Sequence, residues 1–498
     1  MINKKYIFVT LFTLCLLAFG STLFYPFVHD DFIYVENNPA IGDLSNIPGI
    51  FAETSILDNT SLRNPYYRPI LEILYRLHYR IFGLNPFGYH LTNVLFHFLN
   101  SILIFFLLNL ITQRAKLAGV IAVLFVVHPV QTEAVACVSG ISNLFYTFFS
   151  LSSILLYLKA FQKKKAKPNW LYLLGALICY AIALFGKEQA IVMPLALVLY
   201  DLCFSGTHRE GRVNRLLGKC LFFFCALQYL FWRKALLGNA IVPWTVISHG
   251  LGANILAVPR ILLTYLGLIV FPQKLHYYRN IDLLDPVWAS ILLLGLVITG
   301  LLFLIRVMPK KNGQLMMFGL GWFLIFLLPV INLIPIVIEY SFVAVFEHFL
   351  YLPIVGILLA CFVLAEFLIE KIIGSQKAHL FNPILVGSIT MLCLILTFKQ
   401  TTYWNGEIPL FKRTVKYEPE FGRAHVLLGR AYVKKDQCSK AIPEFQKALV
   451  IFENYRVSTK SPLLANLYSG LIRNVEEDLS ICCQQSENSK AVKQTLSP

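Results

Sequence analysis

The stretch "GYHLTNVLFHFLNSILIFFLLNLI", residues 88–111, decides the class of fold. It is long enough to cross a bilayer as a helix, and it contains no Asp, Glu, Lys or Arg. Similar apolar runs recur along the 498-residue chain, which is 57% hydrophobic and 14% charged. A soluble protein of this size carries nearly twice that charged fraction. The sequence therefore predicts an all-α, polytopic membrane protein.

The apolar runs predict about eleven transmembrane helices. They lie near residues 6–27, 88–111, 117–135, 138–159, 169–185, 189–204, 216–237, 286–306, 314–336, 350–371 and 380–398. Alternate loops between them are rich in Lys and Arg, as expected of cytoplasmic loops. The net charge of +16 thus indicates topology and not a nucleic-acid partner. The N-terminus, with an uncleaved first span, is expected inside and the C-terminus outside.

Three segments are expected to project outward: residues 28–87, residues 238–285 and the tail from about 399. Within the second, "ILAVPRILLTYLGLIVF" (255–271) is apolar enough to span. A crossing there would put Lys310 and Lys311 on the wrong side, so a re-entrant or interfacial helix is expected. Four basic residues would then lie outside, against the usual bias, where they would meet an anionic partner unless the topology differs locally: Arg233, Lys234, Lys274 and Arg279.

Polar residues interrupt the apolar span at 88–111. His90, Asn93, His97 and Asn100 recur at spacings of 3, 4 and 3, which places them along one helix face. Polar side chains in a membrane helix face the interior of the bundle or a water-filled cavity, and they indicate function by default. The alternative is hydrogen bonding between helices, which is about as plausible for the deeper His97 and Asn100.

An acidic pair follows the first span in "FVHDDFIYVENNPAI", residues 27–41. Asp30 and Asp31 could anchor the span or cap a helix. Alternatively, one of them could act as a general base towards an acceptor hydroxyl. Together with Glu133 they could also supply oxygen ligands to a divalent metal, although the sequence fixes no such geometry and requires no cofactor.

Two further short motifs lie where spans reach the same side. In "VVHPVQTEAV" (126–135), helix capping explains Thr132 well and Glu133 in part, but it leaves His128 unexplained. In "FGKEQAIVMP" (185–194), Lys187 and Glu188 form either a local ion pair or part of a site. The ionisable and polar residues expected to converge on this outward-facing cavity are Asp30, Asp31, Arg68, His90, His128, Glu133, Lys187, Glu188, Glu347 and His348.

The expected chemistry follows from these charges. Arg68 and Lys187 could neutralise a phosphate that departs as a sugar–phosphate bond breaks. A lipid-borne donor could enter from the bilayer, which gives a reason for building the site within membrane helices. The sequence has no Gly-rich phosphate loop, and a soluble nucleotide-sugar donor is therefore less favoured.

The tail differs in character from the rest of the chain. Small and large residues at Leu428, Gly429, Tyr432, Ala441, Phe445 and Ala448 have the spacing of a tetratricopeptide repeat. Phe411, Thr414 and Pro419 fit the second helix of a preceding repeat, and residues 463–483 are expected to form a degenerate capping pair of helices. So short an array is expected to lean on the membrane domain and to bind a protein partner. A simple helical lid is the alternative.

The 11 cysteines show no metal-ligand spacing, and most lie within apolar spans as small buried residues. The adjacent pair Cys482–Cys483, near the end of the tail, is too weak a signal to assign a disulfide or a metal site.

The ordered motifs "HDD", "NPYYRPI", "GYHLTNVLFH", "HPVQTEAV", "GKEQ" and "EHFLYLP", followed by the repeat tail, resemble the transmembrane and tetratricopeptide-repeat-containing family. This family belongs to the C-type glycosyltransferases, with the protein O-mannosyltransferases, and the chain looks like a short prokaryotic-type member. The resemblance implies an inverting sugar transfer from a polyprenyl-phosphate donor to a hydroxyl of a protein Ser/Thr or a glycan, on the extracytoplasmic face. It implies a membrane domain over 1–398 and a repeat domain over 399–498.

The resemblance also implies roles for individual residues. Asp30 or Asp31 would be the catalytic base, and Arg68, Lys187 and His348 would bind the donor phosphate. The remaining substrate-binding positions would be His90, Asn93, His128, Glu133, Glu188 and Glu347.

The chain departs from the family pattern at three positions. Gln131 stands where a second histidine is common, and Gly186 stands where a serine is common. His348 replaces the arginine usual in the last motif, and a histidine would bind phosphate more weakly and in a pH-dependent way. The compact form and the single clear repeat favour a prokaryotic inner membrane over the endoplasmic reticulum, which would be the location in a eukaryote.

Two other classes of function compete with an enzyme. A transporter or flippase of a lipid-linked or anionic substrate would also need a polar, basic, outward cavity. Such a protein usually shows symmetry between its halves, and the motifs have no second copy. A non-catalytic scaffold whose tail recruits partners would leave the buried histidines and carboxylates unexplained.

Overall fold

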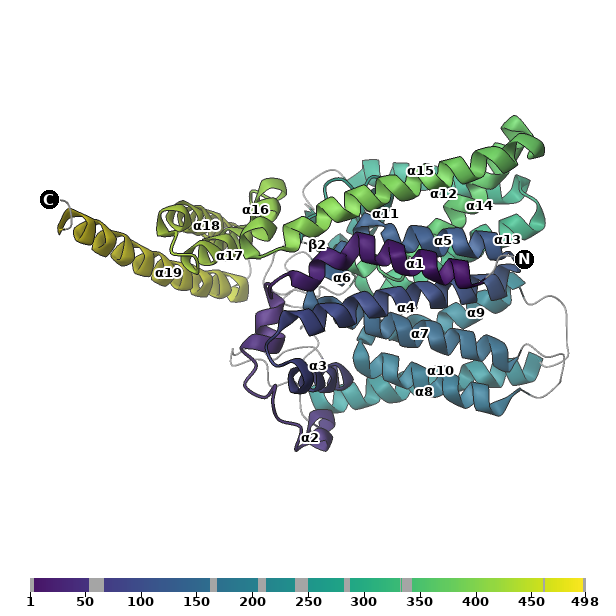
Figure 1. Cartoon of the computed structure of the whole chain (residues 1–498), viewed down its shortest axis with the longest axis horizontal. Coiled ribbons are helices and arrows are strands. Elements are labelled where there is room, and N and C mark those ends of the chain that lie inside the picture. The colour runs from purple at the N-terminus through teal and green to yellow at the C-terminus, as the bar shows by residue number, and fades with distance from the viewer. Residues whose placement is uncertain are drawn as a thin grey trace.

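The computed structural model describes residues 4–52, 67–161, 168–204, 212–237, 250–281, 287–331, 333, 343–459 and 462–495. Most of these residues are helical, and the long helices run side by side in one bundle (Figure 1). The N-terminus lies at one end of the bundle and the tail projects from the other, which we call the outer end. The expected all-α membrane architecture is confirmed.

The helices of the bundle follow the predicted apolar runs closely. They are α1 (Lys4–Phe19, continued by the 3-10 turn Gly20–Phe24), α4 (Pro86–Thr112), α5 (Ala115–Val127), α7 (Ile141–Ala160), α8 (Trp170–Gly186), α9 (Met193–Phe204), α10 (Arg212–Leu237), α11 (Gly250–Val270), α12 (Val287–Val307), α13 (Lys310–Leu327), α14 (Ile354–Ile373) and α15 (Ser375–Thr401). Within the described ranges, seven helices are long and apolar enough to cross a membrane, and a bent pair makes an eighth. Other members of the predicted eleven are shorter, such as α8 with 17 residues and α9 with 12.

The bent pair joins α5 to the segment Pro129–Ala136 at an angle of 54°. Pro129 explains the break, because a proline pushes the preceding residue out of the helical region. His128 accordingly has extended backbone angles, with φ −73° and ψ 128°. The predicted span at 117–135 is therefore two helices, and the second, α6 (Thr132–Ala136), lies at the outer end.

The stretch expected to be re-entrant or interfacial, 255–271, lies in one continuous helix, α11. Its last turn meets the break in the bent pair, where the carbonyl of Ile269 lies 3.0 Å from His128 Nε2. Tyr265 and Ile261 of α11 are fully buried, so one face of this helix belongs to the core.

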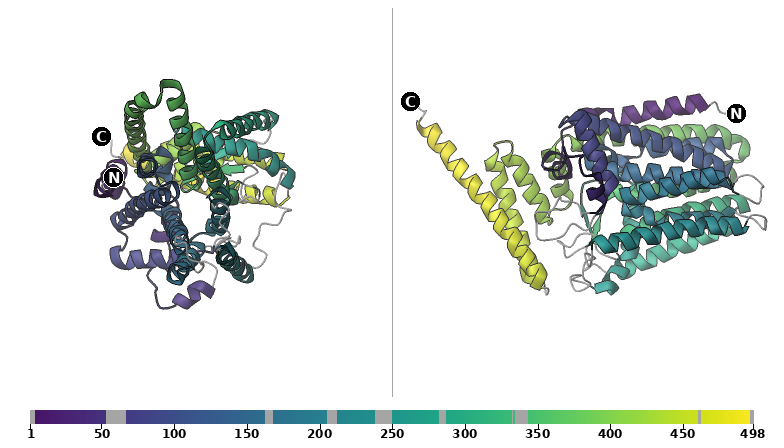
Figure 2. Two further views of the ribbon diagram at one scale, coloured as in Figure 1. Left: turned by 90° about the vertical axis from the view of Figure 1, so that its right-hand side faces the viewer. Right: turned by 90° about the horizontal axis from the view of Figure 1, so that it is seen from below.

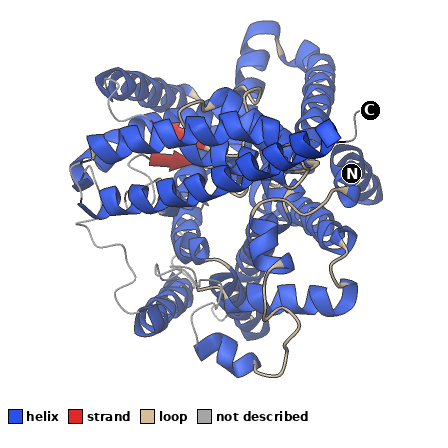
Figure 3. Cartoon of the chain, turned by 90° about the vertical axis from the view of Figure 1, so that its left-hand side faces the viewer, coloured by secondary structure: helices blue, strands red, loops and turns tan. Residues whose placement is uncertain are grey.

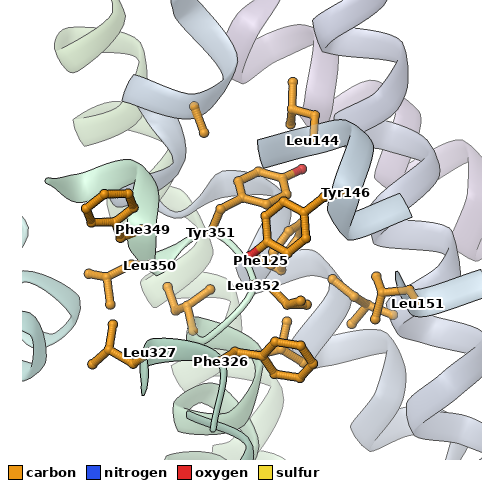
Figure 4. Packing of buried hydrophobic residues seen from close by; sticks show 14 of the residues in the cluster. Phe125, Leu144, Tyr146, Leu151, Phe326, Leu327, Phe349, Leu350, Tyr351 and Leu352 are labelled. Carbon is orange, nitrogen blue, oxygen red and sulfur yellow. The ribbon is translucent and has the colours of Figure 1, made fainter. Parts of the chain in front are cut away.

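Small residues and aromatic rings build the interior of the bundle. A Cβ atom on Gly319 of α13 would lie 2.4 Å from the carbonyl oxygen of Gly356 on α14, so these two helices cross with their backbones in contact. Beneath the outer end, Tyr351 packs edge-on against Phe125 at 5.2 Å between ring centres, with Tyr146 nearby (Figure 4). In contrast, α12 has no buried residue, as expected of a helix that faces lipid.

Short elements cover the outer end of the bundle. They are the π-turn Phe32–Glu36, α2 (Ile47–Ala52), α3 (Pro69–Phe82), α6, the 3-10 turns Val138–Gly140, Glu188–Val192 and Glu347–Leu350, and an antiparallel pair of strands, β1 (Arg279–Ile281) and β2 (Val343–Val345). Arg279 pairs with Val345 in this ladder. Figure 3 looks onto this end and shows helices of the tail in front of the two strands.

The tail consists of α16 (Glu407–Tyr417), α17 (Gly422–Val433), α18 (Cys438–Ser458) and α19 (Pro462–Thr495). The six residues with repeat spacing are all buried in the α17–α18 pair, and a Cβ on Gly429 would collide with the Phe445 ring at 2.4 Å. The core of the tail also includes Tyr25, Val28, Ala136 and Cys137 of the membrane part. The tail thus packs against the outer end.

The capping pair of helices expected over 463–483 was wrong. This region lies within the single helix α19, which extends away from the bundle (Figure 2). Gly470 is a weak break, and its neighbours are mostly good helix formers, so the helix continues through it.

Candidate active site

The acidic pair after α1 divides into a buried member and an accessible one. Asp31 is fully buried, and its carboxylate accepts hydrogen bonds from the backbone N–H groups of Ser139 (2.7 Å), Val28 (3.1 Å) and Val138 (3.4 Å). Burial raises the pKa of Asp31 to about 6, although these hydrogen bonds oppose the shift. Asp31 therefore ties the chain after α1 to the turn that precedes α7.

The local fold of that turn depends on Gly140. A Cβ atom there would lie 2.2 Å from the carbonyl oxygen of Ala134, so a larger residue would push the turn away from α6. The thiol of Cys137 adds a fourth contact to Asp31, at 3.4 Å.

Asp30 has a different environment. Its side chain is 39% exposed, and it meets His29 Nε2 at 3.3 Å. His29 has a φ of +51°, in the left-handed region that few residues other than glycine adopt. This backbone angle lies at the point where the chain turns into the short helical segment that carries both aspartates. The His29 ring packs edge-on against Tyr277 at 4.8 Å and against Phe411 of the tail at 5.6 Å.

Lys187 is a buried basic residue between α8 and the turn Glu188–Val192. Lys187 is 3% exposed and donates a 2.6 Å hydrogen bond from Nζ to Asn143 Oδ1 of α7. Its Nζ lies 5.9 Å from the centre of the Tyr146 ring and 5.7 Å from that of Phe349. Burial and the charge of Arg68 lower the pKa of Lys187 to about 7.

Arg68, the residue before the start of α3, forms a bidentate ion pair with Glu188. Its Nη2 lies 2.7 Å from Oε1 and its Nε lies 3.0 Å from Oε2. Burial alone would raise the pKa of Glu188, but the charge and hydrogen bonds of Arg68 lower it to about 2. The ion pair considered within the Lys187–Glu188 turn is therefore replaced by a pair between Glu188 and Arg68, while Lys187 donates to Asn143.

Glu133 and His348 form a second link. The Glu133 carboxylate accepts a 2.9 Å hydrogen bond from the backbone N–H of His348, and it lies 2.7 Å from His348 Nδ1.

The side chain of Glu347, the residue before His348, contacts a different part of the chain. Its Oε1 accepts a 2.7 Å hydrogen bond from the N–H of His276 and lies 3.8 Å from Arg279. Burial raises the pKa of Glu347 to about 8, in spite of the charge of Arg279.

The polar face of α4 is used for packing between helices. Asn93 donates to the carbonyls of Cys137 (2.7 Å) and Val135 (3.2 Å), and Asn100 donates to the carbonyl of Leu144 (2.9 Å). His97 lies 2.8 Å from the hydroxyl of Tyr351 and 3.1 Å from the carbonyl of Val126. These contacts match the alternative of hydrogen bonding between helices.

Two other predicted histidines are also buried. His128 uses both ring nitrogens, towards the Ile269 carbonyl and the Val130 N–H, and so it holds the break in the bent pair against α11. His90 lies beside the carbonyls of Tyr25 and Pro26, at a geometry short of a regular hydrogen bond.

The structure therefore brings the predicted residues to one end of the bundle but in several separate groups. Asp30 and Asp31 form one group, Arg68, Lys187, Glu188, Glu133 and His348 a second, and Glu347 a third. The charge of Glu133 links the second group to the third, because it acts on Glu347, and it also acts on His29 beside Asp30. Among the described residues, no three His, Cys, Asp or Glu side chains come close enough to hold a metal ion.

Sequence reasoning missed two residues of the site. Asn143 was visible as a polar residue in an apolar span. Tyr75 of α3 gave no signal, yet its buried hydroxyl lies within electrostatic range of Asp31 and Arg68. That hydroxyl makes no hydrogen bond within the described part of the chain. A substrate oxygen could satisfy it, since an unpaired buried hydroxyl is costly.

Comparison with known proteins places this geometry in context. Residues 64–232 match the family described as dolichyl-phosphate-mannose-protein mannosyltransferase. The chain is 25% identical over 467 residues to a protein O-mannosyl-transferase of Caenorhabditis elegans, which covers 89% of this chain and 62% of that protein. Protein O-mannosyl-transferase TMTC1 of Homo sapiens is 24% identical over 497 residues, or 88% of this chain and 54% of that protein.

A shorter region is more similar still. TMTC1 of Mus musculus is 31% identical over 210 residues, which cover 40% of this chain and 22% of that protein. An oligosaccharyltransferase structure from Archaeoglobus fulgidus aligns with a TM-score of 0.46 and 12% identity, covering 83% of this chain and 55% of that chain. The chain thus spans less than two thirds of the length of each of these proteins.

Proposed function

We propose, from the premise that this chain belongs to the transmembrane O-mannosyltransferase-like family, that it is a membrane glycosyltransferase. It transfers a sugar from a polyprenyl-phosphate donor to a hydroxyl of a protein or a glycan at the outer end of the bundle, on the extracytoplasmic face. The observation that carries the proposal is the acidic pair, in which Asp31 is locked by backbone hydrogen bonds while Asp30 remains accessible.

Asp30 is the general base in this proposal. A base must reach the proton that it removes, and Asp30 offers an exposed carboxylate whereas the oxygens of Asp31 are already occupied. The acceptor hydroxyl gives its proton to Asp30, and its oxygen bonds to C1 of the sugar. The bond from C1 to the phosphate oxygen breaks on the opposite face, so the configuration at C1 inverts and polyprenyl phosphate leaves.

Lys187 is the favoured group for the donor phosphate. An ammonium has three N–H donors. Among the described residues Lys187 uses one of them, on Asn143, so two can point to phosphate oxygens. In a buried setting such donors stabilise the charge that develops on the leaving group. Arg68 and His348 are held by Glu188 and Glu133, and in this proposal they orient the region around Lys187.

Other residues predicted to bind substrate instead hold the backbone and side chains of the site in position. Asn93 holds the turn whose N–H groups bind Asp31, and His128 holds the break before α6. Glu188 and Glu133 hold Arg68 and His348 in place. Tyr75 supplies a buried hydroxyl for a sugar or acceptor oxygen. The tail reaches the same region, because Phe411 contacts His29, and so the acceptor is expected to approach between the tail and Asp30.

A transfer assay tests this proposal. The full-length protein in lipid vesicles would receive a panel of radiolabelled polyprenyl-phosphate sugars, with a host extract as a source of protein and glycan acceptors. We expect label in the acceptor fraction with at least one donor, and loss of that label with Asp30→Asn. No transfer from any donor by the folded protein would contradict the enzyme assignment.

A further inference from the structure

Two cysteines meet in the core of the tail. Cys438 begins α18 and Cys482 lies on α19, 44 residues further along the chain, and their Sγ atoms are 2.9 Å apart. Both side chains are buried, with 8% and 0% exposure. The two helices that carry them pack along one another. A pair of thiols is thus fixed at the contact between the last two helices.

We propose that Cys438 and Cys482 form a disulfide that ties α19 to α18. The bond length of a disulfide is about 2.05 Å, so the sulfur atoms need to approach by less than about 1 Å. The oxidant is a second disulfide, small or protein-borne. One cysteine thiolate attacks it to give a mixed disulfide, and the other cysteine displaces the remaining thiol. The cysteine pair is oxidised to a disulfide and the donor disulfide is reduced to two thiols.

The structure also separates Cys482 from its neighbour Cys483, a pair to which the sequence alone assigned no disulfide. Cys483 is adjacent to Cys482, but consecutive residues of a helix point in directions about 100° apart. Cys482 therefore points into the core towards Cys438, whereas Cys483 is exposed. Cys137 also borders the core of the tail, but its thiol contacts Asp31 and Ser139.

The disulfide would strengthen a weakly held part of the chain. α19 is 34 residues long and extends away from the bundle, so it depends on its packing against α17 and α18 (Figure 2). A link between residues 438 and 482 encloses α18 and the first part of α19, and it limits the conformations open to the unfolded tail. Disulfides persist in oxidising compartments, which agrees with a tail outside the membrane.

Mass spectrometry of the full-length protein tests the proposal. The protein would be purified in detergent, incubated with oxidised glutathione, alkylated and digested with trypsin without reduction. We expect a linked pair of peptides, "DQCSK" (436–440) and "NVEEDLSICCQQSENSK" (474–490), which separates on reduction. Trypsin should cleave the native tail at least about tenfold more slowly in the oxidised protein.

Serine variants identify the partners. The linked pair should disappear in Cys438→Ser and in Cys482→Ser and should persist in Cys483→Ser, which is the matched control. Loss of the link in Cys483→Ser with retention in Cys482→Ser would overturn the assignment. Alkylation of both Cys438 and Cys482 after oxidation of the wild type would also overturn it. The linked peptides are detected without any measurement of sugar transfer. A negative result would therefore contradict the disulfide and leave the proposed function unaffected.

Discussion

The polar face of α4 and the polar outer end of the bundle differ in how completely the protein itself satisfies their side chains. Asn93, His97 and Asn100 lie 2.7 to 3.2 Å from partners on neighbouring segments. At the outer end, among the described residues, Asp30 meets His29 at 3.3 Å and Lys187 uses one of its three donors. Asn93, His97 and Asn100 thus use their donors for packing, although His90 on the same face makes no regular hydrogen bond among the described residues. Asp30 and Lys187 retain hydrogen-bonding capacity for a ligand.

The same contrast separates neighbouring residues of one loop. Asp31 is as deeply buried as the α4 residues and is held by backbone N–H groups, whereas Asp30 is open. Substitutions in the satisfied groups should therefore reduce stability, and substitutions in the open groups should reduce activity. The following predictions test this division.

The largest effect on activity apart from that of the base is expected at Lys187. Lys187→Met keeps the length and removes the charge, so the donor phosphate would lose its charge-assisted hydrogen bonds and donor affinity should fall about 10- to 100-fold. The measurement is the KM for the polyprenyl-phosphate sugar. Lys219→Met is the control, because Lys219 of α10 is paired with Asp201. Unchanged donor affinity in Lys187→Met would remove Lys187 from the donor site.

Donor binding should also depend on pH through the same residue. Burial and the charge of Arg68 lower the pKa of Lys187 to about 7, so the ammonium loses its charge as the pH rises through neutrality. Donor affinity should therefore fall between pH 6 and pH 8.5, by up to about tenfold per pH unit above the pKa. Lys187→Arg should flatten this part of the profile, since arginine stays charged. An affinity that rises with pH would contradict this role.

Tyr351→Phe should destabilise the protein and leave catalysis intact. The Tyr351 hydroxyl contacts His97 and Asn100, and its removal leaves buried polar groups unpaired at a cost of about 1–3 kcal/mol. Thermal unfolding in detergent would report a lower Tm, and kcat per folded molecule would be unchanged. Tyr172→Phe, on an exposed part of α8, provides a control. A fall in kcat at constant Tm would place Tyr351 in the site instead.

The smallest effect is expected at the contact between the tail and the acidic loop. Lys434 Nζ lies 3.9 Å from the centre of the Phe32 ring and 2.8 Å from Glu407, but half of the side chain is exposed. Lys434→Ala should therefore cost less than about 1 kcal/mol. A larger drop in Tm would show that this single contact holds the tail in place.

Hydrophobic patterning predicted much of the fold. The apolar runs and the buried α17–α18 residues follow from residue type and spacing. The break at Pro129 was missed, because residues 117–135 were expected to form one span. The extra helix expected within 463–483 failed because a degenerate repeat carries little turn signal. The 34-residue α19 runs through Gly470 without a break.

The site was harder to predict, for a physical reason. Its residues were visible as charges near span ends, but their partners were not. Asp31 is held by backbone N–H groups of a turn 107 and 108 residues away, and a backbone group has no signature in sequence. The pairing of Arg68 with Glu188, and not of Lys187 with Glu188, depends on how α3 packs at the end of α8. Whether a polar residue is satisfied is therefore a property of the fold.

The most direct test measures two quantities on the two aspartate variants. Asp30→Asn should reduce kcat for label transfer by at least about 100-fold with an unchanged Tm, because the general base is lost and no buried contact is broken. Asp31→Asn should lower Tm, since its amide group would face backbone N–H donors, while kcat per folded molecule stays close to that of the wild type. Full activity in Asp30→Asn, with loss of kcat at normal Tm in Asp31→Asn, would contradict the central claim and assign the base to Asp31.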